Sequence, residues 1–359
     1  MGSSSIFSSP TFGGRCYTFD SMNPIFSACR PSRNCFPSLL WAALLLPWHP
    51  AAAVVTGAVL ERPAADAATS TILPLWPQDN LAAVTREILV FDQPDNPNAI
   101  KRGVLRPSLT LYQPVRGTAN GAAVVVVPGG AYQRNYLTAG GFDFANFLVA
   151  HGYIVGLLKY RMADPERTGA GVPLPIADGL RAMRLLRSEA VRFGAHPHWI
   201  GLVGTSAGGH IAASCAAFGD AGNPNSADPV ERVSSRPDFL ILHSPVISVE
   251  PGLMSAGIRA GLLGPHPEPR MVERYTLYKQ VGRNWPPTLL VFARNDTIPT
   301  LNSYRLIDAI KREGRPVDTL IYDEGGHAFA LQNLTGPRAE WPQKWLEWMQ
   351  AQIRALPRE

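Results

Sequence analysis

Three residues that lie far apart along the chain have the side chains that acyl-transfer chemistry requires. The first, Ser206, lies in Gly-Thr-Ser-Ala-Gly-Gly-His, residues 204–210, a G-x-S-x-G pattern with one further glycine. An apolar run precedes it and a helical pattern follows, and this order of strand, turn and helix exposes a nucleophilic serine. A glycine-rich helix start without chemistry is the alternative. The context favours Ser206 as the nucleophile, with the amide of Ala207 at the helix N-terminus as an oxyanion donor.

A serine hydroxyl is a weak nucleophile near neutral pH, so Ser206 needs a base within hydrogen-bond distance. Among the eight histidines, His327 lies in Glu-Gly-Gly-His-Ala-Phe after the last predicted strand, where a loop leaves its ring free to reach the serine. His210 follows Ser206 by four residues and is expected to point away. His243 ends another strand and is predicted to line the substrate pocket. The other histidines are interpreted as structural or as part of the N-terminal segment.

The third residue is an acid that holds the tautomer of the imidazole and stabilises its charged form. Asp296, in Asn-Asp-Thr-Ile-Pro after the penultimate strand, is predicted to take this role. Asp323 and Glu324 are competitors because they lie close to His327 in sequence. That proximity disfavours them, since a residue on the same short loop has little freedom to approach the ring from behind.

A second glycine-rich turn follows the first predicted parallel strand, in Val-Pro-Gly-Gly-Ala-Tyr, residues 127–132. Alone, this pattern indicates only a turn. Together with Ser206 it predicts that the amides of Gly129 and Gly130 complete the oxyanion hole, in the loop where this chemistry usually places it. Tyr132 is predicted to line the substrate pocket.

Apolar runs alternate with helical patterns through most of the chain. The runs are continuous, as in strands buried on both faces of a parallel sheet, and lie at 122–127, 153–158, 199–203, 239–242, 288–292 and 319–322. Helical periodicity covers 139–151, 176–193, 207–218, 301–313 and 338–354. This alternation predicts a doubly wound, mostly parallel α/β sheet, with 87–91 and 109–113 as its antiparallel start.

We expect one catalytic domain over residues 84–359, because the chain of 359 residues is 46% hydrophobic, which suits a single large core. Residues 54–83 are rich in Ala and Pro and are predicted to form an extended leader that lies over the domain surface. A long connection at about 247–286 is interpreted as a small cap over the substrate pocket. An ordinary surface excursion is the alternative for that segment.

The N-terminal residues 1–53 have the order of a signal peptide, with Arg30 and Arg33 before an apolar stretch at 39–46 and then Ala51-Ala52-Ala53. The apolar stretch is shorter than the roughly 20 residues that a membrane span needs, so we expect no stable membrane anchor. We expect export to the periplasm or the outside of the cell, with cleavage near Ala53. Met22 is an alternative start. Cleavage would leave Cys215 as the sole cysteine, without an internal disulfide.

The charge of the chain is modest and scattered. The formal net charge is +5, and loss of residues 1–53, with three Arg and one Asp, would leave +3. No run of Lys and Arg with interleaved aromatic residues is present, so nucleic acid is not an expected partner. Small molecules or neutral polymers are the expected partners, and the sequence indicates no oligomeric state.

Several motifs in order along the chain resemble the bacterial acetyl-esterase and acetylxylan-esterase-like branch of the α/β hydrolases. They are Pro-Gly-Gly-Ala-Tyr, Leu-Lys-Tyr-Arg, Gly-Thr-Ser-Ala-Gly-Gly-His, Asn-Asp-Thr-Ile-Pro and Gly-Gly-His-Ala-Phe, and the likeness runs from about Pro74 to the C-terminus. The resemblance implies an α/β-hydrolase fold that cleaves small acyl groups, typically acetyl, from sugars or other alcohols, with no metal and no cofactor. Pro128 stands where hormone-sensitive-lipase-like esterases have histidine. Ala131 stands where near relatives often have glycine, which would narrow the acyl pocket.

Two rival functions remain open from the sequence. A serine peptidase on the same fold would use the same three residues, although the propeller-like repeats common in such peptidases are absent from the sequence. A non-catalytic ligand-binding protein on this fold usually lacks part of the triad, whereas all three members are present in this sequence.

Overall fold

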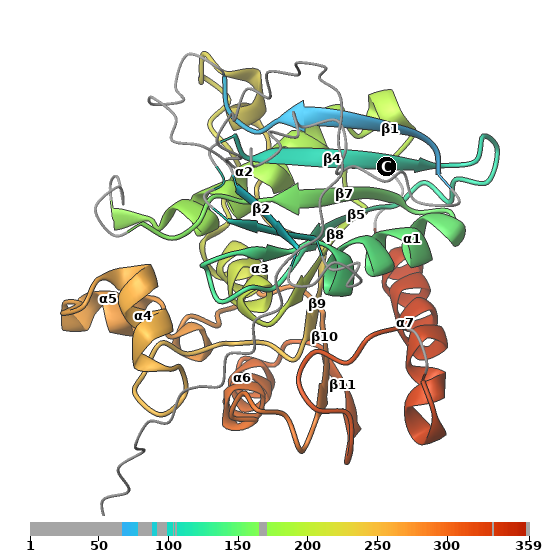
Figure 1. The fold of residues 1–359 in the computed structure, drawn as a ribbon. Coiled ribbons are helices and arrows are strands. Elements are labelled where there is room, and N and C mark those ends of the chain that lie inside the picture. Colours follow the sequence, from blue (N-terminus) through green and yellow to red (C-terminus); the bar gives the residue numbers. More distant parts are fainter. Residues whose placement is uncertain are drawn as a thin grey trace, which may run out of the picture. The chain divides into compact units, whose positions relative to one another are not determined.

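An eight-stranded sheet forms the centre of the chain, in the order β1-β4-β7-β5-β8-β9-β10-β11 (Figure 1). The computed structural model describes residues 67–77, 88–91, 99–102, 104, 106–164, 171–331 and 334–356. The strands of this sheet are β1 (Ala67–Pro74), β4 (Ser108–Pro114), β5 (Ala123–Val127), β7 (Ile154–Lys159), β8 (Ile200–Thr205), β9 (Phe239–His243), β10 (Thr288–Ala293) and β11 (Val317–Tyr322). β5 and β7 to β11 are parallel, while β4 is antiparallel to both β7 and β1.

Helices cover both faces of this sheet. Residues of α2 (Leu174–Glu189), α3 (Ala207–Phe218) and α6 (Leu301–Arg312) join one buried cluster, and residues of α1 (Asp143–Ala150) and α7 (Trp341–Ala355) join the other. A π-helix at Thr138–Phe142 leads into α1. Short 3-10 helices occur at Val191–Phe193, Pro229–Arg232, Leu277–Lys279 and Gly336–Glu340. The predicted doubly wound, mostly parallel α/β sheet is confirmed.

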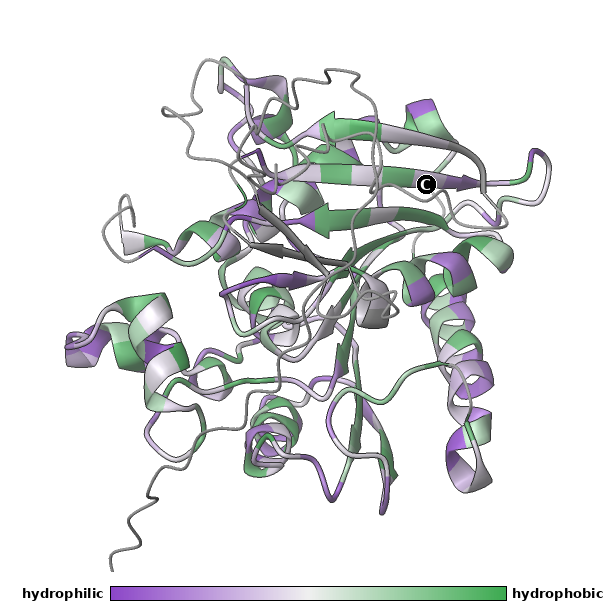
Figure 2. Cartoon of the chain, in the orientation of Figure 1, coloured by the Kyte–Doolittle hydropathy of each residue, from purple (hydrophilic) through white to green (hydrophobic). Residues whose placement is uncertain are grey.

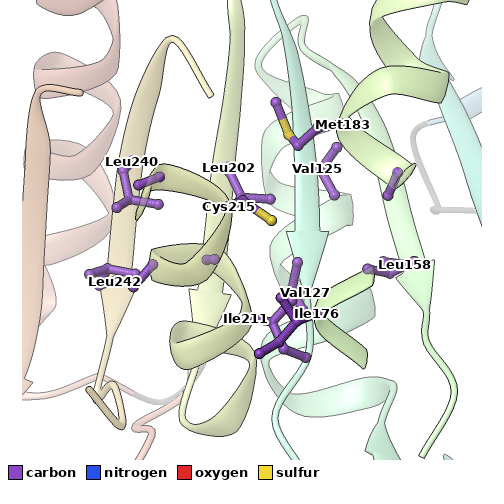
Figure 3. Close-up of a cluster of buried hydrophobic side chains, with 14 of the residues drawn as sticks. Val125, Val127, Leu158, Ile176, Met183, Leu202, Ile211, Cys215, Leu240 and Leu242 are labelled. Atoms are coloured by element: carbon purple, nitrogen blue, oxygen red, sulfur yellow. The ribbon is translucent and has the colours of Figure 1, made fainter. Parts of the chain in front are cut away.

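The core lies between the central parallel strands and the helices that cross them. All residues of β5 are buried, as are those of β8 to β10. Figure 3 shows Val125 and Val127 of β5 near Met183 and Ile176 of α2, and the same buried cluster includes Leu202 of β8 and Leu240 of β9. Figure 2 shows the matching distribution, with apolar residues along the strands and polar residues on the outer sides of the helices. Removal of this apolar surface from water stabilises the fold.

Cys215 belongs to this core. Its side chain is fully buried on α3, where it packs among apolar residues, and it forms no disulfide. Burial raises the pKa of its thiol, because an apolar environment disfavours the thiolate.

The first part of the fold differs from the sequence prediction. Residues 67–74, which were expected to lie in a surface leader, form β1 and pair with β4 along the edge of the sheet, and the following Leu75 is fully buried. The run predicted at 87–91 does not join the main sheet. It forms β2 (Ile88–Phe91), which pairs with β3 (Ala99–Arg102), and β3 pairs with β6 (Asn135–Tyr136). The other run, at 109–113, lies in β4 as the antiparallel strand expected.

A buried carboxylate fastens the end of β1 to the domain. Asp178 of α2 is fully buried and accepts hydrogen bonds from the guanidinium and the backbone amide of Arg161, at 2.6 to 3.1 Å. It also accepts one from the indole of Trp76, at 2.7 Å. The rings of Trp76 lie beneath the guanidinium groups of Arg161 and Arg181. Asp178 is therefore paired with an arginine and links three segments of the chain.

The long connection at 247–286 contains two short helices, α4 (Ala256–Leu263) and α5 (Pro269–Arg274). Its start is held by Asn302, a fully buried residue of α6 whose carbonyl oxygen accepts from the amides of Ile247 and Ser248. The same side chain donates to the carbonyl of Leu253. Both the oxygen and the nitrogen of the Asn302 amide therefore have hydrogen-bond partners, and these bonds anchor the connection to the domain.

The predicted signal segment, residues 1–53, lies outside the described residues, as does most of the predicted leader. Among the helices that the structure describes, none combines the length and the apolar character needed to cross a bilayer.

Candidate active site

Ser206 occupies a sharp turn between β8 and α3. Its backbone is left-handed, with φ 56° and ψ −121°, which is uncommon for a residue with a side chain. Glycines next to the turn allow the close packing that it requires. A Cβ atom at Gly204 would lie 2.3 Å from the carbonyl oxygen of Gly208, and one at Gly208 would lie 2.3 Å from the carbonyl oxygen of Val127. Strain of this kind is typical of functional residues that the surrounding structure holds in place.

The structure brings the three predicted catalytic side chains together. His327 Nε2 lies 2.9 Å from Ser206 Oγ, and His327 Nδ1 lies 2.8 Å from Asp296 Oδ1. These contacts suit the neutral tautomer with its proton on Nδ1, which donates to the carboxylate while Nε2 accepts from the hydroxyl. The side chain of Asp296 is 3% exposed and that of His327 is 28% exposed. The carboxylate is therefore shielded from water, while the imidazole is accessible to substrate.

The two competing carboxylates take other partners. Asp323 is 91% exposed and pairs with Arg294 at 3.0 Å. Glu324 accepts a hydrogen bond from the amide of Asn295. Asp296 also accepts from the amide of Ile298 at 2.7 Å, which fixes its carboxylate. Of the three carboxylates weighed from the sequence, Asp296 is the one that contacts the imidazole.

The glycine loop after β5 packs directly against the serine. A Cβ atom at Gly129 would lie 3.1 Å from the Cβ of Ser206, and one at Gly130, where φ is +137°, would lie 1.9 Å from the carbonyl oxygen of Arg134. The carbonyls of both glycines accept hydrogen bonds from residues 133–136. Within the described part of the chain, the backbone amides of Gly129, Gly130 and Ala207 donate to no backbone carbonyl. These amides therefore have donor capacity left for a developing oxyanion.

The two residues predicted to line the pocket are buried beneath the site. Tyr132 is 1% exposed, has φ 62° and contacts the ring of His210 edge to face. His243 is 1% exposed, stacks on Trp341 and lies edge to face against Phe329. These positions differ from the predicted ones, because the ring of His243 extends into the aromatic cluster formed with α7 and Tyr132 packs into the core.

Two histidines near the site are held in the neutral form by burial. Burial lowers the pKa of His243 to about 3, with the neighbouring His327 lowering it further and Asp296 opposing the shift. Burial also lowers the pKa of His210 to about 4, and its Nε2 lies 2.8 Å from the carbonyl oxygen of Tyr275. As expected from its place in the helix, His210 is not a contact of Ser206 Oγ.

A pH dependence of stability follows from the buried imidazole of His243. An unfolded chain binds a proton at this residue below about pH 6.5, whereas the folded chain excludes it down to about pH 3. The contribution of the neutral His243 ring to the free energy of unfolding is therefore fully present above about pH 6.5, and it is lost as the pH falls from there toward about 3. His243→Phe keeps an aromatic ring and removes the titration, so it should flatten the decline by roughly 1.4 kcal/mol per pH unit. Urea unfolding at pH 7.5 and pH 4.5 measures this, and an unchanged difference would contradict it.

Comparison with known proteins finds similarity to esterases and related proteins. The BD-FAE family model matches residues 109–244, which include Ser206 and the glycine loop but end before Asp296 and His327. An acetylxylan esterase of Xylanibacter ruminicola is 26% identical over 217 residues, which cover 59% of this chain and 42% of that protein. Endo-1,4-beta-xylanase B of Butyrivibrio fibrisolvens is 29% identical, over 58% of this chain and 33% of that protein. The chain thus matches less than half the length of either relative.

Solved structures resemble nearly the whole described fold. An acetyl ester-xyloside bifunctional hydrolase from Caldicellulosiruptor lactoaceticus is 29% identical, with a TM-score of 0.66 over 78% of this chain and 96% of that chain. An esterase from Thermogutta terrifontis, bound to propionate, has 21% identity and a TM-score of 0.55 over 79% of this chain and 98% of that chain, which shows the shared fold. The sheet order and these likenesses show that the chain has the α/β-hydrolase fold and is similar to acetyl esterases and acetylxylan esterases.

Proposed function

We propose that the chain is a serine carboxylic-ester hydrolase that removes small acyl groups, above all acetyl, from esters of sugars or other alcohols. The observation that carries this proposal is the chain of hydrogen bonds from Ser206 Oγ through the imidazole of His327 to Asp296. The likeness to acetyl and acetylxylan esterases supports the choice of acyl group and alcohol.

The proposed reaction has two halves. Ser206 Oγ attacks the ester carbonyl as His327 Nε2 takes its proton, and the carbonyl oxygen gains negative charge. The amides of Gly129, Gly130 and Ala207 donate to this oxyanion, each worth about 3 kcal/mol of transition-state stabilisation. The imidazolium then protonates the leaving alcohol, and the acyl group stays on Ser206. Water, deprotonated by His327, attacks the acyl-enzyme, and the imidazolium then returns this proton to Ser206 Oγ as the carboxylic acid is released.

Two residues of the loop after β5 bear on the size of the acyl group. Ala131, with φ 55°, carries a methyl group in a loop position where a glycine would leave more room. A side chain at residue 129 would pack tightly against the nucleophile, because its Cβ would lie 3.1 Å from the Cβ of Ser206. We therefore propose that acetyl and other short acyl groups are preferred over long ones.

Labelling with a fluorophosphonate tests the proposed nucleophile without knowledge of the natural substrate. The reagent phosphonylates an activated serine, so mass spectrometry should find the adduct on the peptide that contains Ser206. Ser214, a buried serine of the same helix whose hydroxyl donates to the carbonyl of His210, should remain unlabelled. Absence of an adduct would favour a non-catalytic binding protein.

A substrate panel then tests the acyl group and the leaving group. It compares p-nitrophenyl esters of increasing acyl length, acetylated xylo-oligosaccharides, other acetylated sugars and peptide p-nitroanilides. We expect kcat/KM to be highest for acetyl esters and to fall as the acyl chain lengthens. Faster cleavage of the anilides than of the esters would instead favour a peptidase.

A further inference from the structure

The segment after β9 contacts the nucleophile through the backbone. The amide of Ser206 donates to the carbonyl of His243 at 3.0 Å, and the carbonyl of Ser206 accepts from the amide of Val246 at 3.1 Å. Residues 243–246 therefore hold both sides of the strained serine turn. Ser244 lies in the middle of this segment.

Ser244 also contacts the loop that carries the imidazole. Its Oγ accepts a hydrogen bond from the amide of Ala328, at 3.0 Å, and this amide directly follows His327. Its own amide donates to the carbonyl of Val291 in β10 at 2.8 Å. The residue is 1% exposed and has φ 44°, so its position is set by the structure around it.

The backbone around His327 needs such support. Gly326 has φ 66° and Ala328 has φ 53°, so the imidazole lies between two left-handed residues. The amide of Gly326 is held by the side chain of Asn295 at 2.8 Å, but this contact is exposed to solvent. The bond from Ala328 to Ser244 is partly buried, so water replaces it less readily.

We infer that Ser244 is a positioning residue that sets the distance between the base and the nucleophile. One short segment fixes the backbone of Ser206 and, through the Ser244 hydroxyl, the loop of His327. A shift of about 1 Å between reacting groups can reduce a rate about 10²-fold, so a single lost acceptor in this segment should affect catalysis. The inference rests on the proposed function, because it assumes that His327 acts as the base for Ser206.

Ser244→Gly and Ser244→Ala test this role. Both remove the acceptor for Ala328, and glycine adopts φ 44° without strain, so Ser244→Gly does not add a backbone penalty for the left-handed conformation. Ser235→Ala is the matched control: Ser235 is fully buried and its Oγ accepts from the amide of Asp220 at 3.0 Å, but its bond joins segments outside the catalytic loops. Melting temperature, kcat and KM are measured for all variants with p-nitrophenyl acetate.

We expect both Ser244 variants to lower kcat about 10- to 100-fold, with KM within about twofold of the wild-type value. Ser235→Ala should keep the wild-type kcat even if its melting temperature falls as much as those of the Ser244 variants. The downfield proton signal of His327 Nδ1–H should weaken or shift in the Ser244 variants only. A melting temperature near that of the control would show that lost folding does not explain the lost rate.

Wild-type kcat in both Ser244 variants, or a loss of kcat in Ser235→Ala of the same size, would overturn the inference. Failure of the proposed function has a different outcome, because the wild-type protein would then neither hydrolyse the ester nor be labelled at Ser206. The Nδ1–H signal reports on the His327 loop in either case, and an identical signal in wild-type and Ser244 variants would also overturn the inference.

Discussion

Replacement of Ser206 by alanine should lower kcat for p-nitrophenyl acetate by about 10³- to 10⁶-fold, because the acyl-enzyme can no longer form. The residual rate would come from the oxyanion donors and from binding, which remain in place. The change is small in structural terms: alanine removes one oxygen, and the backbone bonds of residue 206 to the carbonyl of His243 and the amide of Val246 are retained. Initial rates at saturating substrate measure the effect.

Ser214→Ala is the control for this variant. Ser214 lies in the same helix and is fully buried, and its hydroxyl donates to the carbonyl of His210 within the helix at 2.8 Å. It should keep kcat near the wild-type value and differ only in melting temperature. Turnover by Ser206→Ala within tenfold of the wild-type rate would refute the assignment of the nucleophile.

Replacement of Asp296 by asparagine should lower kcat by about 10⁴-fold while the fold is retained. The amide nitrogen of asparagine can donate to His327 Nδ1, which would place the proton of the imidazole on Nε2, where it cannot accept from Ser206. Asp296 Oδ1 also accepts from the amide of Ile298, so an asparagine nitrogen at this position would leave that amide without its acceptor, and the melting temperature should fall slightly. Steady-state rates measure kcat, and circular dichroism with thermal unfolding reports the fold.

Asp323→Asn provides the comparison, because Asp323 was the sequence neighbour that competed for the same role. It is 91% exposed and pairs with Arg294 at the surface, where an ion pair contributes little. Its kcat should therefore stay close to the wild-type value. If Asp323→Asn lost as much activity as Asp296→Asn, the assignment of Asp296 would be wrong.

The sequence predicted the parallel core and the arrangement of the three polar residues because both follow from short local patterns. Continuous apolar runs identify buried strands. Each catalytic side chain lies at or shortly after the end of such a strand: Ser206 after β8, Asp296 after β10 and His327 after β11. The carboxyl ends of parallel strands lie at one edge of a sheet, so residues in these turns meet without further information. The glycines near Ser206 gave the same indication through the turn that they permit.

Other features depend on pairings that no local pattern reveals. Residues 67–74 have no strong alternation, and they form a strand only because β4 offers an unpaired edge. His243 follows a strand like the other site residues, but its ring packs on Trp341, which lies about a hundred positions later. The hydroxyl of Ser244 reaches Ala328 over a similar separation. No sequence pattern distinguishes a serine at the end of a strand that is buried and holds another loop from one that is exposed to solvent.

The position of β1 at the outer border of the sheet bears on how the protein can be shortened. Arg181 donates to the carbonyl of Leu75 at 2.7 Å and Trp76 donates to Asp178, so the residues after β1 are tied into the domain. A truncated chain that starts after Pro77 would leave the main chain of β4 open to solvent, and such a bare border can pair with another molecule and aggregate. Proteases that trim the N-terminus should therefore leave a soluble product only if they stop before Ala67.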